Sequence, residues 1–370
     1  MEAKGVKEET LVTREEVIWG YRMLLGRDPE SESAIEAQLH IPDIETLRQA
    51  FLGCPEFARS KRASLHDIRP TVTELDIGLL NRYAPSACEL LREPECITNW
   101  LGLKTEVSLF GASADQLRGR IISEIPINGD GLYGGYCEYA SFLTAIDQAL
   151  SRSEFTAVEV GSGWGPWISS IGLVCLRQGF RQINLVGVEA DAGRLRLMQN
   201  HLARNNLLDA PNIKWRLIEG AAWSSDTTLH FPIIEPMVDH GAAVSRTPTQ
   251  RDYRGRELEH IPIPAYSLST ICEGLEVIDY MHWDVQGVEV EIARSAASFL
   301  NRRVRYLFIG THSLPIEGDL VRFFYENQWD VLHYDPCHYR YDRSRPSMEG
   351  MLRRDGEIFA CNPGITLTRK

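Results

Sequence analysis

The stretch that decides the fold is Val158-Glu159-Val160-Gly161-Ser162-Gly163-Trp164-Gly165. An apolar run of strand length ends in a carboxylate, glycine follows at three alternate positions, and a helical pattern begins directly afterwards. Glycine permits a tight turn and lets a ligand lie against the backbone. Because ligands of open α/β sheets bind at the carboxyl ends of the strands, this loop is a predicted binding site.

A second carboxylate is in register with this loop. The next predicted strand ends in Val186-Gly187-Val188-Glu189-Ala190-Asp191, and Glu189 lies 24 residues after Gly165. That distance fits one strand–helix–strand unit, and a carboxylate at the tip of the second strand can accept both hydroxyls of a ribose. The pattern therefore predicts a nucleoside-containing ligand.

A dinucleotide is excluded by the glycine spacing. The dinucleotide fingerprint is Gly-x-Gly-x-x-Gly. Counted from Gly161 the sixth position is Pro166, and counted from Gly163 it is Ile168. The last glycine of the fingerprint is therefore missing in both registers.

From about residue 136 onward, strand-length apolar runs alternate with helical stretches. This alternation favours an α/β fold with a doubly wound, mostly parallel sheet of seven strands. The last run follows its predecessor through a loop, which predicts an antiparallel strand at the edge of the sheet. The predicted strands are 157–160, 185–188, 213–218, 277–285, 304–309, 329–333 and 357–361, and the predicted helices are 165–178, 191–206, 287–300 and 315–328.

The front of the chain has a different, all-helical pattern. Thr13 and Glu16 have the spacing of a capping box, and Asp43 is a predicted N-cap. We therefore divide the chain into a small helical domain at 13–62, a linker and cap region at 63–135, and an α/β domain at 136–370. The helical domain resembles a small domain of unknown function that is often found on bacterial glycan-processing proteins, through the segments Tyr21 to Pro29 and Phe51 to Phe57.

Composition and charge restrict the class of protein. The 370 residues carry a net charge of −12, so a general nucleic-acid-binding surface is not expected. No secretory signal and no apolar stretch long enough to span a bilayer is visible. The eight cysteines are scattered and form no Cys-x-x-Cys motif, which favours reduced thiols in a cytoplasmic protein.

The glycine loop resembles the first motif of class I S-adenosylmethionine-dependent methyltransferases, and later segments resemble their FkbM family. These segments are 278–289, with Asp284, Gln286 and Glu289, and 304–313, with its following His312. Many relatives carry Glu where this chain has Gln286. The resemblance covers about 136–363 and also takes in 164–167, 252–255 and 355–357. It implies S-adenosylmethionine as cofactor, and the cofactor-binding residues that it implies are Glu159, Gly161, Ser162, Gly163, Gly165, Trp167, Glu189, Ala190, Ala221, Ala222 and Asp284.

Methyl transfer to an alcohol requires a base or a metal that makes the oxygen nucleophilic. Period-two alternation places His282 and Asp284 on one face of the fourth strand, and His312 follows the neighbouring fifth strand. We predict His312 as the general base and Asp284 as an orienting or cofactor-facing carboxylate, with His282 as a further catalytic candidate. The alternatives are that His312 caps a backbone carbonyl, that His282 is a hydrogen-bonded core residue, and that Asp284, His312 and an acidic residue hold Mg²⁺.

The acceptor is expected to be a hydroxyl of a sugar, glycan or glycosylated metabolite. This expectation rests on the family and on the front domain; a polyketide-like alcohol and a non-catalytic cofactor-binding scaffold are the alternatives. No nucleic-acid partner is expected. The expected partners are a second copy of the chain, in a homo-oligomer, or glycan-assembly enzymes that contact the helical domain. The predicted acceptor-site residues are Tyr133, Tyr136, Asp239, His240, Tyr253 and Arg254.

Overall fold

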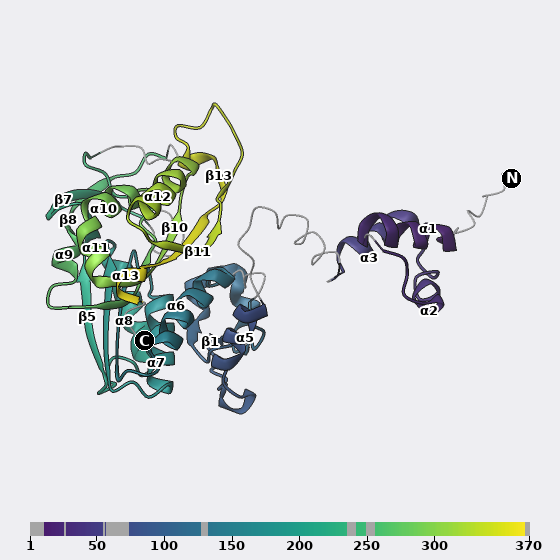
Figure 1. Ribbon diagram of the computed structural model, residues 1–370, viewed down its shortest axis with the longest axis horizontal. Helices are drawn as coiled ribbons and strands as arrows, with labels where there is room; N and C mark the ends of the chain where they lie inside the picture. Colours follow the sequence, from purple (N-terminus) through teal and green to yellow (C-terminus); the bar gives the residue numbers. More distant parts are fainter. Residues whose placement is uncertain are drawn as a thin grey trace. The chain divides into compact units, whose positions relative to one another are not determined.

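The computed structural model describes residues 11–25, 27–54, 56, 74–126, 132–234, 242–248 and 256–366. The chain divides into two compact units, Met1–Thr71 and Val72–Lys370. We call them the N-terminal unit and the sheet unit and describe each by itself (Figure 1). Within the described residues, no helix is long and apolar enough to cross a membrane.

The N-terminal unit is helical. The predicted capping box is present: the Thr13 amide donates to Glu16 Oε2 at 2.7 Å and the Glu16 amide donates to Thr13 Oγ1 at 3.3 Å. Asp43 is the N-cap of the third helix, as predicted, and accepts a hydrogen bond from the Thr46 amide. A small core includes Val17, Ile35, Leu47 and Phe51. The elements are α1 (Arg14–Gly20), a π-helical turn (Tyr21–Leu25), α2 (Glu32–Glu36) and α3 (Ile44–Leu52).

The sheet unit contains the predicted doubly wound sheet. Its seven strands have the order β11-β14-β10-β9-β3-β4-β5, and all of them except β14 run parallel. The fold class predicted from the sequence is confirmed. The strands are β3 (Glu154–Val160), β4 (Gln182–Glu189), β5 (Ile213–Glu219), β9 (Ile278–Trp283), β10 (Val304–Thr311), β11 (Asp330–Asp335) and β14 (Gly356–Cys361).

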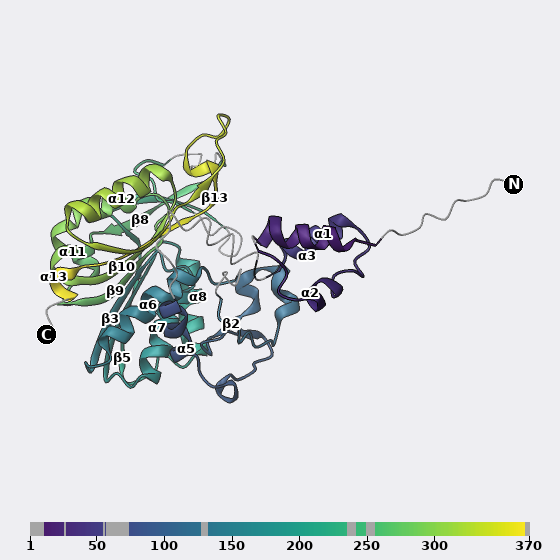
Figure 2. The same cartoon turned by 45° about the vertical axis from the view of Figure 1, so that its right-hand side comes forward.

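Helices cover both faces of this sheet (Figure 2). One face packs under α5 (Glu74–Tyr83), α6 (Tyr136–Ala149), α7 (Pro166–Arg177) and α8 (Ala192–Arg204). The other packs under α9 (Leu268–Ile271), α10 (Glu289–Ser295), α11 (Ala297–Arg303) and α12 (Leu314–Glu326). A last short helix, α13, covers Pro363–Thr366. The apolar residues of α6 and of α7 fill the first interface. Because both faces of the sheet are covered, residues on both sides of each strand are buried, and this accounts for the continuous apolar runs of the strands.

The prediction for the last strand was wrong in one respect. β14 is antiparallel, but it lies between β10 and β11 and not at the edge, with Phe359 opposite both Phe308 and His333. Ile358 and Ala360 are buried on one face and Phe359 on the other, as an internal strand requires. Because β14 runs backwards, its first residues lie at the carboxyl edge of the parallel strands.

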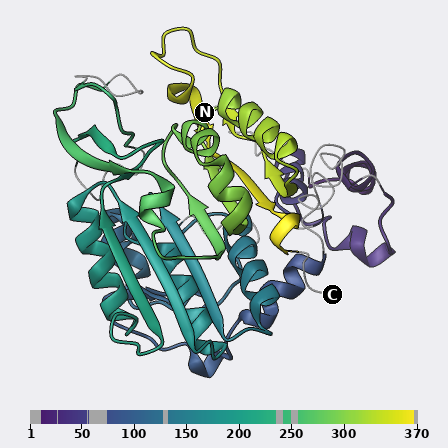
Figure 3. The same cartoon turned by 60° about the vertical axis from the view of Figure 1, so that its left-hand side comes forward.

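Small sheets and turns lie around the edges of the main sheet (Figure 3). The stretch 72–135, before α6, belongs to the same compact unit as the sheet. These further elements are β1 (Cys96–Thr98) with β2 (Lys104–Glu106), β6 (Ala221–Ala222) and β7 (Thr227–Pro232) with β8 (His260–Tyr266), β12 (His338–Tyr339) with β13 (Leu352–Arg354), and 3₁₀ turns at Ala87–Glu89, Val107–Phe110, Ala112–Leu117 and Glu349–Met351.

Candidate active site

A cavity of about 630 Å³ opens at the carboxyl ends of β3, β4 and β9. The glycine loop after β3, the tip of β4 and the turn after β9 all line it. This is the place where an open α/β sheet binds its ligand. The predicted cofactor-binding residues that line it are Glu159, Gly161, Ser162, Gly163, Trp167, Glu189, Ala190, Ala221, Ala222 and Asp284.

The glycine loop lies against the turn that follows β9. Gly161 has φ +76°, and a Cβ at this position would overlap the carbonyl oxygen of Asp284. Gly163 has φ +54° and no heavy atom within 4 Å of the place where its Cβ would be. The first glycine therefore permits close packing of two loops, and the second leaves bare backbone toward the cavity. Gly165, with φ +73°, packs against Met198 and does not line the cavity.

The two predicted carboxylates hold the loop in shape. Glu189 Oε2 accepts from the Gly163 amide at 2.7 Å, and its Oε1 accepts from the Asp191 amide at 2.8 Å. Glu159 Oε2 accepts from the Ile168 amide in the first turn of α7. Burial raises the pKa of both carboxyl groups. Each carboxylate oxygen has more than one acceptor position, so Glu189 can still accept from a ligand hydroxyl in the cavity.

The third side of the cavity is apolar. Ala221 and Ala222 of β6 line it together with Phe231, Ala242 and Val244. Trp223, the residue after β6, is not among the lining residues, and the Arg246 guanidinium lies 5.2 Å from its ring centroid. A flat, small-residue wall beside Glu189 suits a planar heterocycle.

Asp284 and His312 are neighbours, as the strand order predicts. His312 Nε2 is 3.1 Å from Asp284 Oδ1, and His312 Nδ1 is 2.7 Å from Oε1 of the fully buried Glu289. The Gln286 Nε2 atom lies 2.7 Å from both Asp284 Oδ1 and His312 Nε2. A carboxamide can turn over to present either oxygen or nitrogen, so it suits either protonation state of the ring.

The two carboxylates set the charge of His312. Burial alone would lower its pKa, but Glu289 and Asp284 on opposite sides of the ring outweigh burial and raise the pKa well above the usual value. For Asp284, burial is offset by the hydrogen bond and the charge of His312, and the pKa falls below its usual value. The site thus holds a buried imidazolium between two carboxylates.

This arrangement does not support two of the sequence-based predictions. A protonated His312 cannot take a proton from an acceptor, and it does not line the cavity. Asp284 and Glu289 contact opposite ring nitrogens, so these two carboxylates and the ring do not converge on one point where Mg²⁺ could sit. The Asp284 side chain, about 45% exposed, is the part of this group that faces the cavity.

His282 has the opposite environment. Its ring stacks on Phe308 with centroids 4.9 Å apart and packs at an angle against Trp167. Within the described residues, neither ring nitrogen makes a hydrogen bond, and Nε2 is 3.6 Å from Glu138 Oε1. Burial lowers the pKa of His282 to about 4, so the ring is neutral at pH 7. His282 and Glu138 both line the cavity.

Of the predicted acceptor residues, the structure places one in the cavity wall. Tyr133 lines the cavity and packs edge to face against Phe110 and Trp164. Tyr136 is the first residue of α6, is buried in the core and does not line the cavity. Asp239, His240, Tyr253 and Arg254 lie outside the described residues.

Residues 96–117, which we call the cap segment, form a further wall. Leu109, Phe110, Ala114, Gln116 and Leu117 of this segment line the cavity. No sequence pattern pointed to them, because the segment consists of short strands and 3₁₀ turns without periodicity. Glu138, in the first turn of α6, was not predicted from the sequence either. Its place in the cavity wall follows from the packing of α6 near His282.

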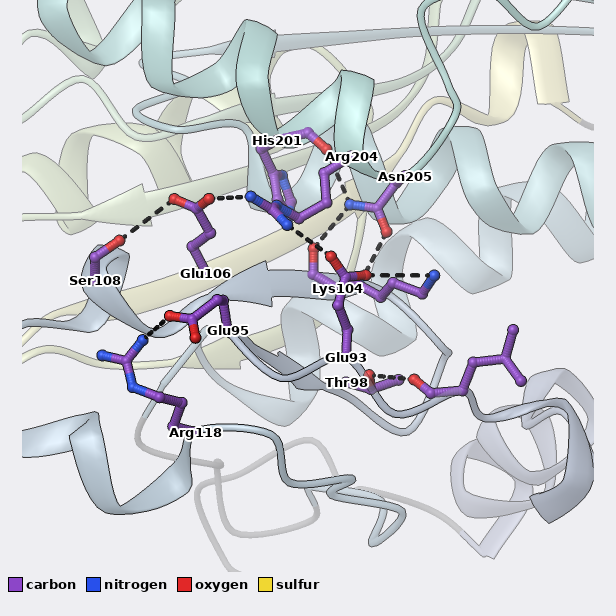
Figure 4. Close-up of polar contacts among 11 residues, drawn as sticks. Glu93, Glu95, Thr98, Lys104, Glu106, Ser108, Arg118, His201, Arg204 and Asn205 are labelled. Carbon is purple, nitrogen blue, oxygen red and sulfur yellow. Dashed lines mark hydrogen bonds and ion pairs between the residues drawn. The ribbon is translucent and has the colours of Figure 1, made fainter.

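Polar contacts with α8 fix the cap segment (Figure 4). Arg204 pairs with Glu93 at 2.6 Å and with Glu106, and the Asn205 carboxamide bonds both backbone groups of Lys104. His201 Nε2 is 2.9 Å from Thr105 Oγ1, which also accepts from the Tyr133 hydroxyl. The wall of the cavity is thereby tied to the helix that follows Glu189.

Comparison with known proteins finds a sequence relative. No family model matches the chain. A protein of Jannaschia sp. (strain CCS1) named "Putative methyltransferase" is 27% identical over 239 residues, which are 64% of this chain and 82% of that protein. The alignment therefore covers most of the relative's length.

Solved structures align with this chain at low similarity. Methyltransferase FkbM from Methylobacillus flagellatus KT aligns at 14% identity and a TM-score of 0.35, over 56% of this chain and 44% of that one, so the chain spans less than half of its length. Precorrin-6y C5,15-methyltransferase from Geobacter metallireducens GS-15 aligns at 10% identity and a TM-score of 0.32, over 60% of this chain and 86% of that one. The sheet described above is mostly parallel and seven-stranded, with one antiparallel strand inserted and helices on both faces, which is a doubly wound α/β fold.

Proposed function

We propose that this protein is an S-adenosylmethionine-dependent O-methyltransferase of the FkbM-like group, acting on a hydroxyl of a sugar, glycan or glycosylated metabolite. The observation that carries the proposal is that the bare glycine loop, Glu189 and Asp284 line one and the same cavity at the carboxyl ends of adjacent strands. The relative named a methyltransferase supports the same reaction class.

The residues present fit this cofactor. Gly163 offers open backbone for an aminoacyl group, Glu189 an acceptor for a ribose diol, and Ala221 and Ala222 a flat wall for adenine. When bound, the cofactor supplies an activated methyl group on a positively charged sulfur. The ionised Asp284 faces the cavity and supplies the complementary negative charge.

We assign proton removal from the acceptor to His282. It is a neutral imidazole in the cavity wall, and the nearby Glu138 carboxylate stabilises the imidazolium that forms when His282 accepts a proton. In-line transfer requires the acceptor oxygen close to the methyl carbon, and the rigid packing of His282 between Phe308 and Trp167 fixes one side of that approach.

His312 is then a positioning residue. It does not reach the cavity, but its hydrogen bond and charge hold Asp284 ionised and in one orientation. Glu289 compensates the charge of the imidazolium from the other side. The proposal of a sugar or glycan acceptor rests on the family resemblance and on the chemistry of the cavity wall. There His282 is available as a base for a hydroxyl that is not acidic by itself.

The proposal is tested by following a labelled methyl group from S-adenosylmethionine to a panel of free sugars, oligosaccharides, glycosylated metabolites and polyketide-like alcohols. We expect transfer to at least one sugar hydroxyl, lowered about 10² -fold or more in Asp284→Asn. The matched control is Asp226→Asn, whose carboxylate lies at the start of α9, outside the cavity lining. Transfer only to the polyketide-like alcohols would replace the acceptor class, and full activity of Asp284→Asn would contradict the site.

A further inference from the structure

Three potential metal ligands meet beneath the start of α6, on elements that are far apart in the sequence. They are the buried Cys137 in the first turn of α6, His333 on β11 and Glu357 on β14. One ligand atom from each, the Cys137 Sγ, a His333 ring nitrogen and a Glu357 carboxylate oxygen, lies within 4.8 Å of the other two. Neither the reaction proposed above nor the cofactor uses any of these three residues.

The unexpected position of β14 creates this meeting point. Because β14 runs antiparallel between β10 and β11, its second residue, Glu357, lies opposite Asp335 at the carboxyl edge of the sheet, and Phe359 lies opposite His333. Glu357 and Phe359 share the sheet face that α6 covers, since residues two apart in a strand point the same way. A Cβ on Gly135, the residue that caps α6, would overlap Glu357 Oε1. The glycine therefore allows the carboxylate to reach the start of the helix.

The electrostatic environment of Glu357 favours a cation. Glu357 is partly buried, Asp335 lies opposite it on β11, and Glu138 adds a further negative charge nearby. The start of a 14-residue helix adds a partial positive charge that suits an anionic ligand such as a thiolate. A buried carboxyl beside other carboxylates is stabilised in its charged form when a divalent ion binds there.

We propose that Cys137, His333 and Glu357 bind one Zn²⁺ ion. Thiolate and imidazole are the ligands that Zn²⁺ prefers, whereas Mg²⁺ prefers oxygen only. Zn²⁺ holds such ligands at about 2.0–2.3 Å, so small side-chain rotations close the observed triangle around it. Three protein ligands leave the fourth tetrahedral position open for water or for a ligand oxygen.

This site is adjacent to the cavity but does not depend on the proposed reaction. Glu138 follows Cys137 in α6, lines the cavity, and is close enough to Glu357 to shift its pKa. A bound ion would therefore lie behind the wall that carries Glu138 and His282. Metal binding can be measured on the full chain without any acceptor, so failure of the zinc site and failure of the methyl transfer are separate results.

The test uses the full chain, freed of metal with a chelator and kept in a non-thiol reductant. Co²⁺ is titrated in, and the thiolate-to-cobalt charge-transfer band reports a cysteine ligand; Zn²⁺ affinity is measured by competition with a chromophoric chelator. The variants are Cys137→Ser and Glu357→Gln, with Cys175→Ser as the matched control, because Cys175 is a buried cysteine of α7 outside the group. Circular dichroism checks that each variant is folded.

We expect the wild-type chain and Cys175→Ser to bind one Co²⁺ ion with the thiolate band. Cys137→Ser should lose the band, Glu357→Gln should keep it, and each should bind Zn²⁺ at least about tenfold more weakly. Zn²⁺ should also raise the melting temperature of the wild-type chain, which tests the site even if a variant misfolds. Absence of one-to-one binding by the wild-type chain, or an unchanged band in Cys137→Ser, would overturn the proposal.

Discussion

Two buried histidines at the ends of neighbouring strands differ in charge: one is an imidazolium and the other a neutral ring. His312, directly after β10, sits between Asp284 and Glu289, and its pKa is raised well above the usual value. His282, in β9, is opposite Phe308 and stacks on it, and burial lowers its pKa to about 4. Because both rings are buried, the comparison teaches that burial alone does not set the charge of a histidine: charged partners on both sides can outweigh it.

The largest expected effect concerns catalysis. His282→Ala should lower kcat about 10²–10⁴-fold, because it removes the only proton acceptor that we assign to the acceptor hydroxyl. The assay is labelled methyl transfer to whichever acceptor the panel identifies, across a range of pH. If instead His312→Ala abolished turnover, His282→Ala were fully active, and high pH rescued His312→Ala, the roles of the two histidines would be reversed.

The second effect concerns stability. His312→Phe leaves the fully buried Glu289 carboxylate without its cation, and removing one partner of a buried ion pair costs about 3–5 kcal/mol. His282→Phe replaces a neutral ring that makes no hydrogen bond within the described residues, so we expect a change within about 1.5 kcal/mol. Urea unfolding of both variants measures the difference. Equal losses of unfolding free energy in the two variants would contradict the different surroundings of His312 and His282.

The third effect is the pH dependence of that stability. Between pH 4 and 6.5 the unfolded chain binds a proton at His282 that the folded chain does not, so His282 makes stability rise with pH, by about 3 kcal/mol over this window. His312 acts in the opposite direction: its contribution is fully present below about pH 6.5 and is lost as pH rises through the raised folded pKa.

The variants separate these two contributions. His282→Phe should flatten the acid side of the stability curve, and His312→Phe should flatten the alkaline side. His201, whose pKa burial lowers to about 3, leaves a residual acid slope in both. An acid side that is as steep in His282→Phe as in the wild type would contradict the low pKa of His282.

The sequence was sufficient for the sheet and for the glycine-loop side of the cavity. Apolar runs and the glycine spacing predicted the strands, the loop at Gly161 and Gly163, and the tip at Glu189, because backbone geometry restricts these positions directly. Strand order also brought Asp284 and His312 together. The charge of His312 could not be predicted, because it depends on Glu289 reaching back from α10.

Other parts depended on tertiary packing that leaves no periodic signal. The insertion of β14 between β10 and β11 requires knowledge of pairing on both sides, and it decides where Glu357 lies. The cap segment has no repeat, and its place over the cavity follows from contacts of Arg204 and Asn205 with residues about a hundred positions earlier. The proximity of Glu138 to His282 depends on the packing of α6 against the sheet, which the sequence alone does not indicate.

The most direct test of the central claim is a calorimetric titration of the purified chain with S-adenosylmethionine and, separately, with NAD. The variants are Glu189→Ala and, as a matched control, Glu219→Ala, which removes a carboxylate at the tip of the neighbouring β5 that does not line the cavity. We predict binding of S-adenosylmethionine alone, lost in Glu189→Ala and kept in Glu219→Ala. Binding of NAD, or binding of S-adenosylmethionine that Glu189→Ala leaves unchanged, would contradict the assignment of this cavity.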